Sequence, residues 1–110
     1  MGKFVKGDVV VIPFPFSDLS NSKRRPALVI AKLKGDDVIL CQITSQARMD
    51  GYNIQLTAAD FSSGSLPLVS NIRPSMLFTG NTETILKKAG NLKQSKINEV
   101  IQKLKEIIDS

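Results

Sequence analysis

The pattern that most constrains the fold lies in residues 24–46, where two apolar runs flank a short polar tip. The runs cover residues 27–31 and 38–43 and are rich in β-branched side chains, which favour strands. The tip contains Gly35, and glycine readily adopts the positive φ of a tight turn. This segment therefore predicts two antiparallel strands joined as a β-hairpin, around which the rest of the chain is organised.

The turn of this hairpin decides which residues face each other. If Lys34 and Gly35 form a two-residue loop, the pairs on the apolar face are Ile30 with Ile39, Leu28 with Cys41, and Pro26 with Ile43. The pairs on the other face are Val29 with Leu40, Ala27 with Gln42 and, at the open end, Arg25 with Thr44. Because side chains alternate across a strand, this register places a guanidinium beside a hydroxyl, and a one-residue slip would separate them. The Arg25–Thr44 pair is our candidate functional site.

Shorter β patterns precede and follow the hairpin. Residues 3–14 predict a strand that ends at Pro13 and Pro15 and whose β-branched run, residues 9–12, suits burial on both faces. One helical turn near residues 58–61 is expected before a loop, and Gly90-Asn91 is expected to stop the last short apolar stretch. Further short strands are expected at residues 52–56, 68–72 and 76–78, with Arg73-Pro74 dividing the last two, and residues 85–86 are the last short apolar stretch.

The end of the chain has the clearest helical pattern. Its apolar residues recur at helical spacing and form one stripe, made by Ile97, Val100, Ile101, Leu104, Ile107 and Ile108. Ser95 is the expected N-cap, and the stripe is expected to pack on the sheet. About five to seven short strands followed by one helix predict a mainly β protein with a C-terminal α-helix, built as a small, strongly bent antiparallel sheet or barrel.

Length and composition set broad limits. A chain of 110 residues, 42% of them hydrophobic, is expected to form a single domain over residues 1–110 with a core of its own. No apolar run approaches the ~20 residues that span a bilayer, so we expect a cytoplasmic protein with no membrane contact. The single cysteine, Cys41, lies on the predicted core face and is expected to be a buried apolar residue.

The inventory of side chains removes most enzyme classes. Histidine is absent, one cysteine cannot form a zinc site, and the aspartates are scattered over separate elements. There is no glycine-rich phosphate loop and no nucleophile elbow, so neither a metal site nor a cofactor is expected. RNA cleavage remains possible, because RNA supplies its own nucleophile, the 2′-hydroxyl. Arg25 would then stabilise charge on the phosphate and Thr44 would orient it, while no side chain is an obvious general base.

Basic and polar residues cluster at the open end of the hairpin. The net charge is +5, and Lys23 and Arg24 precede Arg25 while Ser45 and Gln46 follow Thr44. These four flanking residues are candidate RNA-binding groups, because phosphate is bound by cations and hydroxyl or amide donors. The same residues also fit a purely structural interpretation, with the arginine in a surface ion pair and the threonine at an ordinary strand end. Phe14 and Phe16 offer a stacking surface but more often such residues belong to a core.

Over essentially its whole length the chain resembles the MazF/PemK family of toxin–antitoxin ribonucleases. The resemblance rests on Lys6-Gly7-Asp8-Val9-Val10, on Arg25-Pro26-Ala27-Leu28-Val29-Ile30, on Ile43-Thr44-Ser45-Gln46, on Ser70-Asn71-Ile72-Arg73 and on the closing amphipathic helix. It implies an SH3-like β-barrel (MazF/PemK/CcdB-like), a homodimer and a cognate antitoxin. It also implies metal-independent cleavage of single-stranded RNA to 2′,3′-cyclic phosphate and 5′-hydroxyl ends.

The resemblance also assigns residues. The catalytic arginine and threonine of the family fall on Arg25 and Thr44, the same pair that the hairpin register selects. Asn71 and Arg73 match a stretch near the family's site and are candidate RNA contacts. The chain departs from the family just before Arg25, because the common Gly-Ser-Glu-x-x-Gly is replaced by residues 19–24, Leu-Ser-Asn-Ser-Lys-Arg. The RNA sequence preference of relatives therefore does not transfer to this chain.

Two other classes of function fit the same pattern. One is a non-catalytic toxin of this fold that binds a protein target such as gyrase, mainly through its C-terminal helix. The other is an RNA-binding module without turnover. The combination of Arg25 with Thr44 favours the ribonuclease, because a toxin that acts through its helix requires neither residue.

Overall fold

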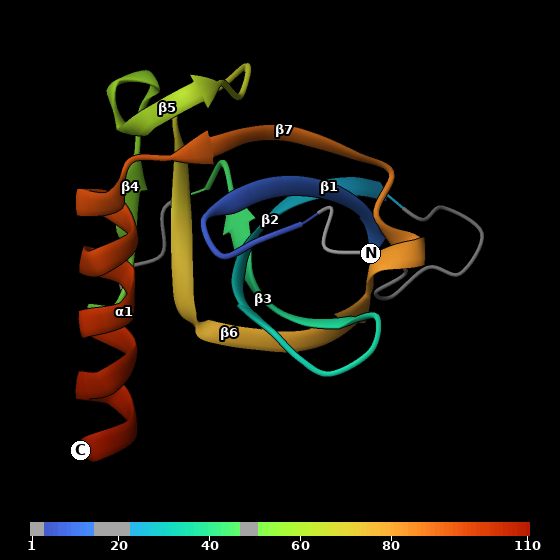
Figure 1. The fold of residues 1–110 in the computed structure, drawn as a ribbon. Coiled ribbons are helices and arrows are strands. Elements are labelled where there is room, and N and C mark those ends of the chain that lie inside the picture. Colours follow the sequence, from blue (N-terminus) through green and yellow to red (C-terminus); the bar gives the residue numbers. More distant parts are fainter. Residues whose placement is uncertain (1–3, 15–22, 47–50) are drawn as a thin grey trace.

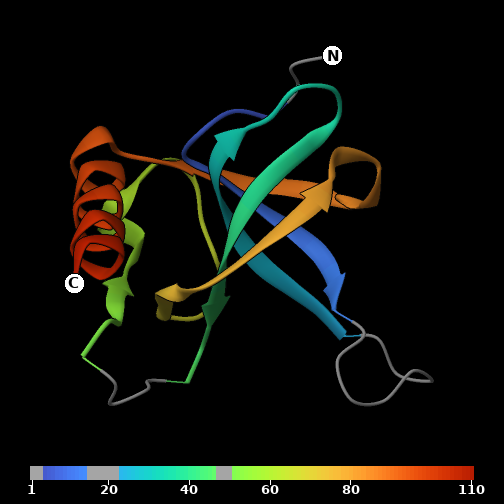
Figure 2. The ribbon, with the colours of Figure 1, turned by 90° about the horizontal axis from the view of Figure 1, so that it is seen from below.

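A computed structural model describes residues 4–14, 23–46 and 51–110. Seven antiparallel strands form one sheet in the order β4-β6-β3-β2-β1-β7-β5, which curls round on itself, and α1 (Gln94–Asp109) lies along its open side (Figures 1 and 2). The strands are β1 (Asp8–Phe14), β2 (Lys23–Lys32), β3 (Asp37–Thr44), β4 (Ile54–Leu56), β5 (Phe61–Gly64), β6 (Ser70–Asn81) and β7 (Lys87–Leu92), with short 3-10 helices η1 (Ala58–Asp60) and η2 (Thr82–Thr84). The predicted fold class, a small bent β structure with a C-terminal helix, is confirmed.

The curled sheet buries side chains on both faces, as the β-branched run of β1 predicts. Val9 belongs to a large apolar cluster that includes Val100 and Leu104 of α1, whereas Val10 belongs to a second cluster with Ala27 and Leu40. Both valines are fully buried. They belong to different clusters because consecutive side chains of a strand point to opposite faces. The sheet is thus covered by α1 on one face and folds over its own apolar side chains on the other.

The central hairpin has the predicted register over part of its length. Ala27 pairs with Gln42 and Val29 with Leu40, but beyond them the register shifts, so that Ala31 and not Ile30 faces Ile39. The cause is a longer loop than expected: β2 ends at Lys32, β3 begins at Asp37, and the Leu33 amide donates to the Asp37 carbonyl at 2.9 Å. The positive φ of Gly35, 74°, is confirmed.

At its open end the β2–β3 ladder stops at the Ala27–Gln42 pair. The expected Pro26–Ile43 and Arg25–Thr44 pairs are therefore absent from the ladder, and proline has no N–H to extend it. Arg25 instead pairs with Ile12 of β1, and Thr44 pairs with Asn71 of β6.

Two strands, β1 and β6, differ from the predictions. Pro13 does not end β1 but pairs with Arg24 inside it, at a point where the β1–β7 ladder has already ended at Val11. An edge position of this kind tolerates proline. Residues 70–78 form part of one strand, β6, which begins two residues later than expected and is not divided at Arg73-Pro74. The ladder is irregular there, because the partner of Cys41 is Leu77 and that of Gln42 is Arg73.

Three further predictions failed in the second half of the chain. The expected loop after η1 is strand β5, and β7 runs through Gly90-Asn91 instead of stopping there. The helix N-cap is Lys93 and not Ser95. The Lys93 carbonyl accepts the first helical hydrogen bonds, from Lys96 at 3.0 Å and Ile97 at 3.1 Å, while the Lys93 amide donates to Asp60 at 2.8 Å. Strand β7 therefore leads directly into α1.

Lys96 links α1 to the sheet edge, and we expect it to stabilise the fold. Its ammonium lies 2.9 Å from the Glu99 carboxylate, 3.1 Å from the Gln55 carbonyl and 3.7 Å from the Asp60 carboxylate, and its side chain is only 12% exposed. Lys96→Ala should lower the free energy of unfolding by about 1–2 kcal/mol in denaturant titrations, because a charge-assisted hydrogen bond is lost. Lys105→Ala, at an exposed helix position, is the control. Equal effects of the two substitutions would show that the Lys96 contacts add nothing.

Candidate functional site

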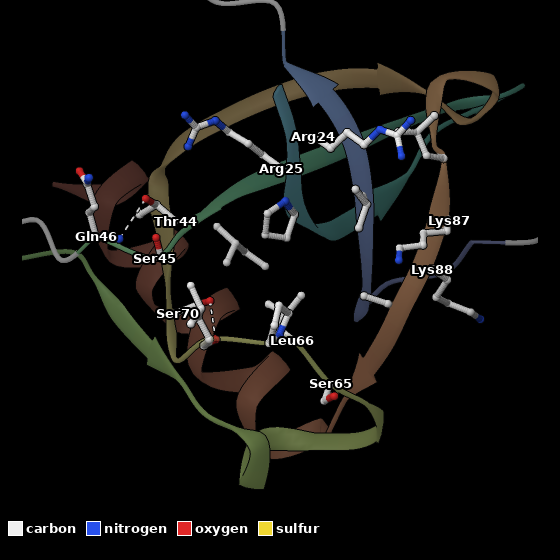
Figure 3. Close-up of a pocket in the computed structure, with 17 residues that line it drawn as sticks. Arg24, Arg25, Thr44, Ser45, Gln46, Ser65, Leu66, Ser70, Lys87 and Lys88 are labelled. Atoms are coloured by element: carbon white, nitrogen blue, oxygen red, sulfur yellow. Dashed lines mark hydrogen bonds between the residues drawn. The ribbon is translucent and has the colours of Figure 1, made fainter. Parts of the chain in front are cut away.

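A cavity of about 880 Å³ opens where β2 and β3 separate (Figure 3). Its floor includes Val11 of β1, Pro26 of β2 and Ile43 of β3, which occupy neighbouring strands. Residues 65–68, which follow β5, form one wall, and residues 86–89 form another. A cavity of this size lies within the usual range for ligand sites.

Most of the predicted site residues line this cavity. They are Arg24, Arg25, Thr44, Ser45 and Gln46. Asn71 and Arg73 do not line it, although they lie in β6 opposite Thr44 and Gln42. Lys23 begins β2, but its side chain is not among the parts that the structure describes, and the same holds for the Phe14 side chain and for Phe16. The roles assigned to these residues stay predictions.

Arg25 and Thr44 share one face of the sheet although they are not a ladder pair. Each lies two residues beyond the Ala27–Gln42 pair, so alternation directs both side chains to the same side. Figure 3 shows the Arg25 guanidinium and the Thr44 hydroxyl directed to the same side of the cavity rim. The Asn71 side chain is on this face too, because it pairs with Thr44.

Both groups have hydrogen-bonding capacity to spare. The Thr44 hydroxyl oxygen accepts a hydrogen bond from the Gln46 amide at 3.2 Å, which leaves its proton free to donate. The Arg25 Nε is buried without a hydrogen-bond partner in the described part of the chain, and so is the Gln42 Oε1. A buried donor without a partner costs free energy, so an anionic ligand at Arg25 would satisfy a group that the folded chain leaves open.

The lining of the cavity is basic. Among the described residues it contains Arg24, Arg25, Lys87 and Lys88 and no aspartate or glutamate. The sequence prediction missed Lys87 and Lys88, because β7 meets β1 only through pairing between distant parts of the chain, for which the local sequence has no signal. Elsewhere in the described segments, no three His, Cys, Asp or Glu side chains gather as a metal site would require.

Cys41 is buried beside the site and chemically protected. Its Sγ–H donates to the Arg73 carbonyl at 2.9 Å. Burial raises the pKa of the Cys41 thiol from 9.0 to about 12, and nearby Arg73 opposes this shift only in part. The thiolate, the reactive form, is therefore strongly disfavoured in the folded protein, in agreement with the prediction of a buried apolar cysteine.

This pKa predicts how stability depends on pH. Below pH 9 the thiol is protonated in the folded and unfolded chains alike, and its contribution to stability is fully present. Between pH 9 and about 12 only the unfolded chain releases the proton, so the free energy of unfolding should fall as pH rises. Denaturant titrations from pH 8 to 10.5 should show a smaller loss for Cys41→Ala than for the wild type. Identical slopes would place the thiol in contact with solvent.

Comparisons with known proteins agree with this architecture. The sequence model of a family described as PemK-like, MazF-like toxin of type II toxin–antitoxin system matches residues 5–108. No curated protein shows significant sequence similarity to the chain. None of the described helices is long and apolar enough to cross a membrane.

Solved structures share the fold at low sequence identity. An endoribonuclease in complex with its cognate antitoxin, from a mycobacterial species, is 14% identical with a TM-score of 0.77, over 96% of this chain and 95% of that one. Toxin MazF-mt6 of Mycobacterium tuberculosis is 15% identical with a TM-score of 0.73, over 93% and 96%. A MazE–MazF structure from Deinococcus radiodurans is 19% identical with a TM-score of 0.76, over 96% of both chains.

Proposed function

Because the chain belongs to the PemK-like, MazF-like toxins of type II toxin–antitoxin systems, we propose that it is an endoribonuclease that cleaves single-stranded RNA without a metal ion. The observation that carries this proposal is the position of Arg25 and Thr44, on one face at the rim of a cavity whose described lining includes four cationic residues and no carboxylate. RNA is the substrate that matches this lining, since it brings both the anionic phosphate and the nucleophile.

The proposed reaction is an internal transesterification. The 2′-oxygen forms a bond to the adjacent phosphorus and the bond from phosphorus to the 5′-oxygen breaks, which yields a 2′,3′-cyclic phosphate and a 5′-hydroxyl. One proton leaves the 2′-hydroxyl and one joins the 5′-oxygen. Arg25 would stabilise the extra negative charge on the phosphate oxygens, and its planar N–H groups are suited to this. The free Thr44 proton would hold a non-bridging oxygen in place.

A cognate antitoxin and a second copy of the chain are the proposed partners. One similar structure is an endoribonuclease with its cognate antitoxin, and another contains MazE with MazF. We infer that an antitoxin of this chain would present acidic side chains to the basic cavity and exclude RNA from it. The homodimer follows from the family resemblance.

Packing of the helix argues against a toxin that acts through α1. Its buried residues, Ile97, Val100 and Leu104, are engaged with the sheet, so most of the apolar stripe is not available to a protein target. Only Ile108, 73% exposed, extends the stripe into solvent.

Incubation of the protein with mixed-sequence RNA in EDTA tests the proposal. New 5′-hydroxyl ends, paired with 2′,3′-cyclic phosphates, are the expected products. RNA binding without new ends would instead support a binding module, and neither binding nor cleavage would support a toxin directed at a protein.

A further inference from the structure

Strand β7 provides a wall of the cavity that lies across the floor from Thr44. Lys87 faces Val11 in the β1–β7 ladder, and Val11 faces Pro26 in the β1–β2 ladder. Residues that face each other in antiparallel strands point to the same side, so Lys87 shares the floor's side of the sheet. Figure 3 shows its side chain directed into the cavity, on the opposite side from Thr44 and Ser45.

Arg24 extends this second basic region. It lies two residues before Pro26 in β2, so alternation places its side chain on the same face as Pro26 and Lys87, and it is exposed to solvent. Arg25, its neighbour, points to the other face. The arginine pair therefore splits, with one guanidinium beside Thr44 and the other on the side of Lys87.

The floor on the side of Lys87 is apolar, and it belongs to the same cavity whose rim carries Arg25 and Thr44. Val11, Pro26 and Ile43 form it, and Leu66 and Leu86 stand in the walls. A nucleotide strand alternates flat, largely apolar bases with anionic phosphates, and proteins that bind single strands line the backbone with cations and cover the bases with apolar side chains, most often aromatic ones. The cavity offers the same kinds of surface, cations at both ends and an apolar floor.

We propose that Lys87, together with Arg24, binds a second phosphate of the RNA strand, and that the apolar floor holds the base between this phosphate and the one at Arg25. The proposal rests on the ribonuclease function and deepens it, because it gives the direction in which the strand crosses the protein. It adds Lys87 to the RNA-binding residues and places Arg24 in a subsite separate from that of Arg25.

Lys88 does not belong to this subsite. Its ammonium lies 3.7 Å from the carboxylate of Asp8, a side chain that is only 1% exposed. Although Lys88 is part of the lining, Figure 3 shows the end of its side chain directed away from the cavity. Lys88 thus stabilises a buried charge, and its substitution would disturb folding and binding together. Lys87 is exposed, so its substitution tests binding alone.

Binding of a fully 2′-O-methylated RNA oligonucleotide tests the subsite without cleavage, because the nucleophile is blocked. Lys87→Ala should weaken binding about three- to tenfold and reduce the slope of log K against log salt by about 0.7, the value for one lost phosphate contact. Leu86→Glu should weaken binding as well, since it puts a carboxylate beside the floor. Lys105→Ala makes the same change of net charge on α1, outside the cavity, and should leave both quantities unchanged.

The outcomes separate the subsite from the proposed function. If unmodified RNA is cleaved but Lys87→Ala binds the methylated oligonucleotide with the same affinity and salt slope as Lys105→Ala, the subsite is wrong and the ribonuclease stands. If Lys87→Ala weakens binding selectively while the wild-type protein leaves unmodified RNA intact, the subsite stands and the ribonuclease is wrong.

Discussion

Arg25→Ala should abolish RNA cleavage, with a loss of at least about a thousandfold in the cleavage rate, while the protein stays folded. The side chain is half-buried at the cavity rim, and its Nε has no hydrogen-bond partner in the described chain, so its loss leaves the apolar clusters intact. Arg25→Lys should retain only a small part of the activity, because an ammonium does not reproduce the planar set of N–H donors. Single-turnover cleavage of a defined RNA measures both.

A matched control exists one residue away. Arg24→Ala removes the same charge from a neighbouring, exposed position, and we expect it to weaken RNA binding with little effect on cleavage at saturating protein. The free energy of unfolding of each variant, from denaturant titration, shows whether the fold is kept. Cleavage by folded Arg25→Ala at the wild-type rate would remove Arg25 from the catalytic site.

Gly64→Ala should cause the largest loss of stability of any single methyl added to the described glycines. Gly64 ends β5 with a φ of 73°, and a Cβ there would lie 2.1 Å from the Ala89 carbonyl oxygen and 2.5 Å from the Gly90 Cα. Both atoms are backbone, so no side chain can move aside. We expect a loss of at least about 3 kcal/mol, from backbone strain and the broken β5–β7 pairing combined. Residues 65–68, which follow β5 and form one wall of the cavity, would lose their support.

Gly35→Ala separates the two causes of this loss. Gly35 has nearly the same φ, 74°, but no atom lies within 4 Å of a Cβ built there. This substitution should lower the free energy of unfolding by only about 1–2 kcal/mol, the energy of a left-handed conformation for an L-residue. Denaturant titration of both variants is the measurement. Equal losses would mean that strand β5 does not approach β7 as closely as the structure shows.

Local patterns in the sequence predicted most of the framework. The hairpin, the doubly buried strand β1 and the apolar stripe of α1 follow from side-chain periodicity, which needs no knowledge of distant residues. The failures have a common cause in long-range pairing. Strand β5 consists of Phe-Ser-Ser-Gly and gains its conformation from β7, and Gly90 fits in β7 because Gly64 faces it closely.

The candidate site was predictable to the same extent. Alternation along β2 and β3 was enough to put Arg25 and Thr44 on one face, even though the ladder between them stops at Ala27–Gln42. Lys87 was not predictable, because its place in the cavity depends on the pairing of β7 with β1. The apolar walls at residues 65–68 depend likewise on the β5–β7 contact. Local sequence was thus enough to propose the chemistry, and tertiary structure added the rest of the surface that we propose binds RNA.

The most direct test of the proposed chemistry compares two oligonucleotides that differ by one methyl group. Cut sites are first mapped on unmodified RNA, and the 2′-hydroxyl on the 5′ side of one cut is then methylated. Internal transesterification predicts that the wild-type protein cleaves the unmodified RNA in EDTA and leaves the methylated position intact. Equal cleavage of both oligonucleotides would show that the nucleophile is not the 2′-hydroxyl and would contradict the mechanism assigned to Arg25 and Thr44.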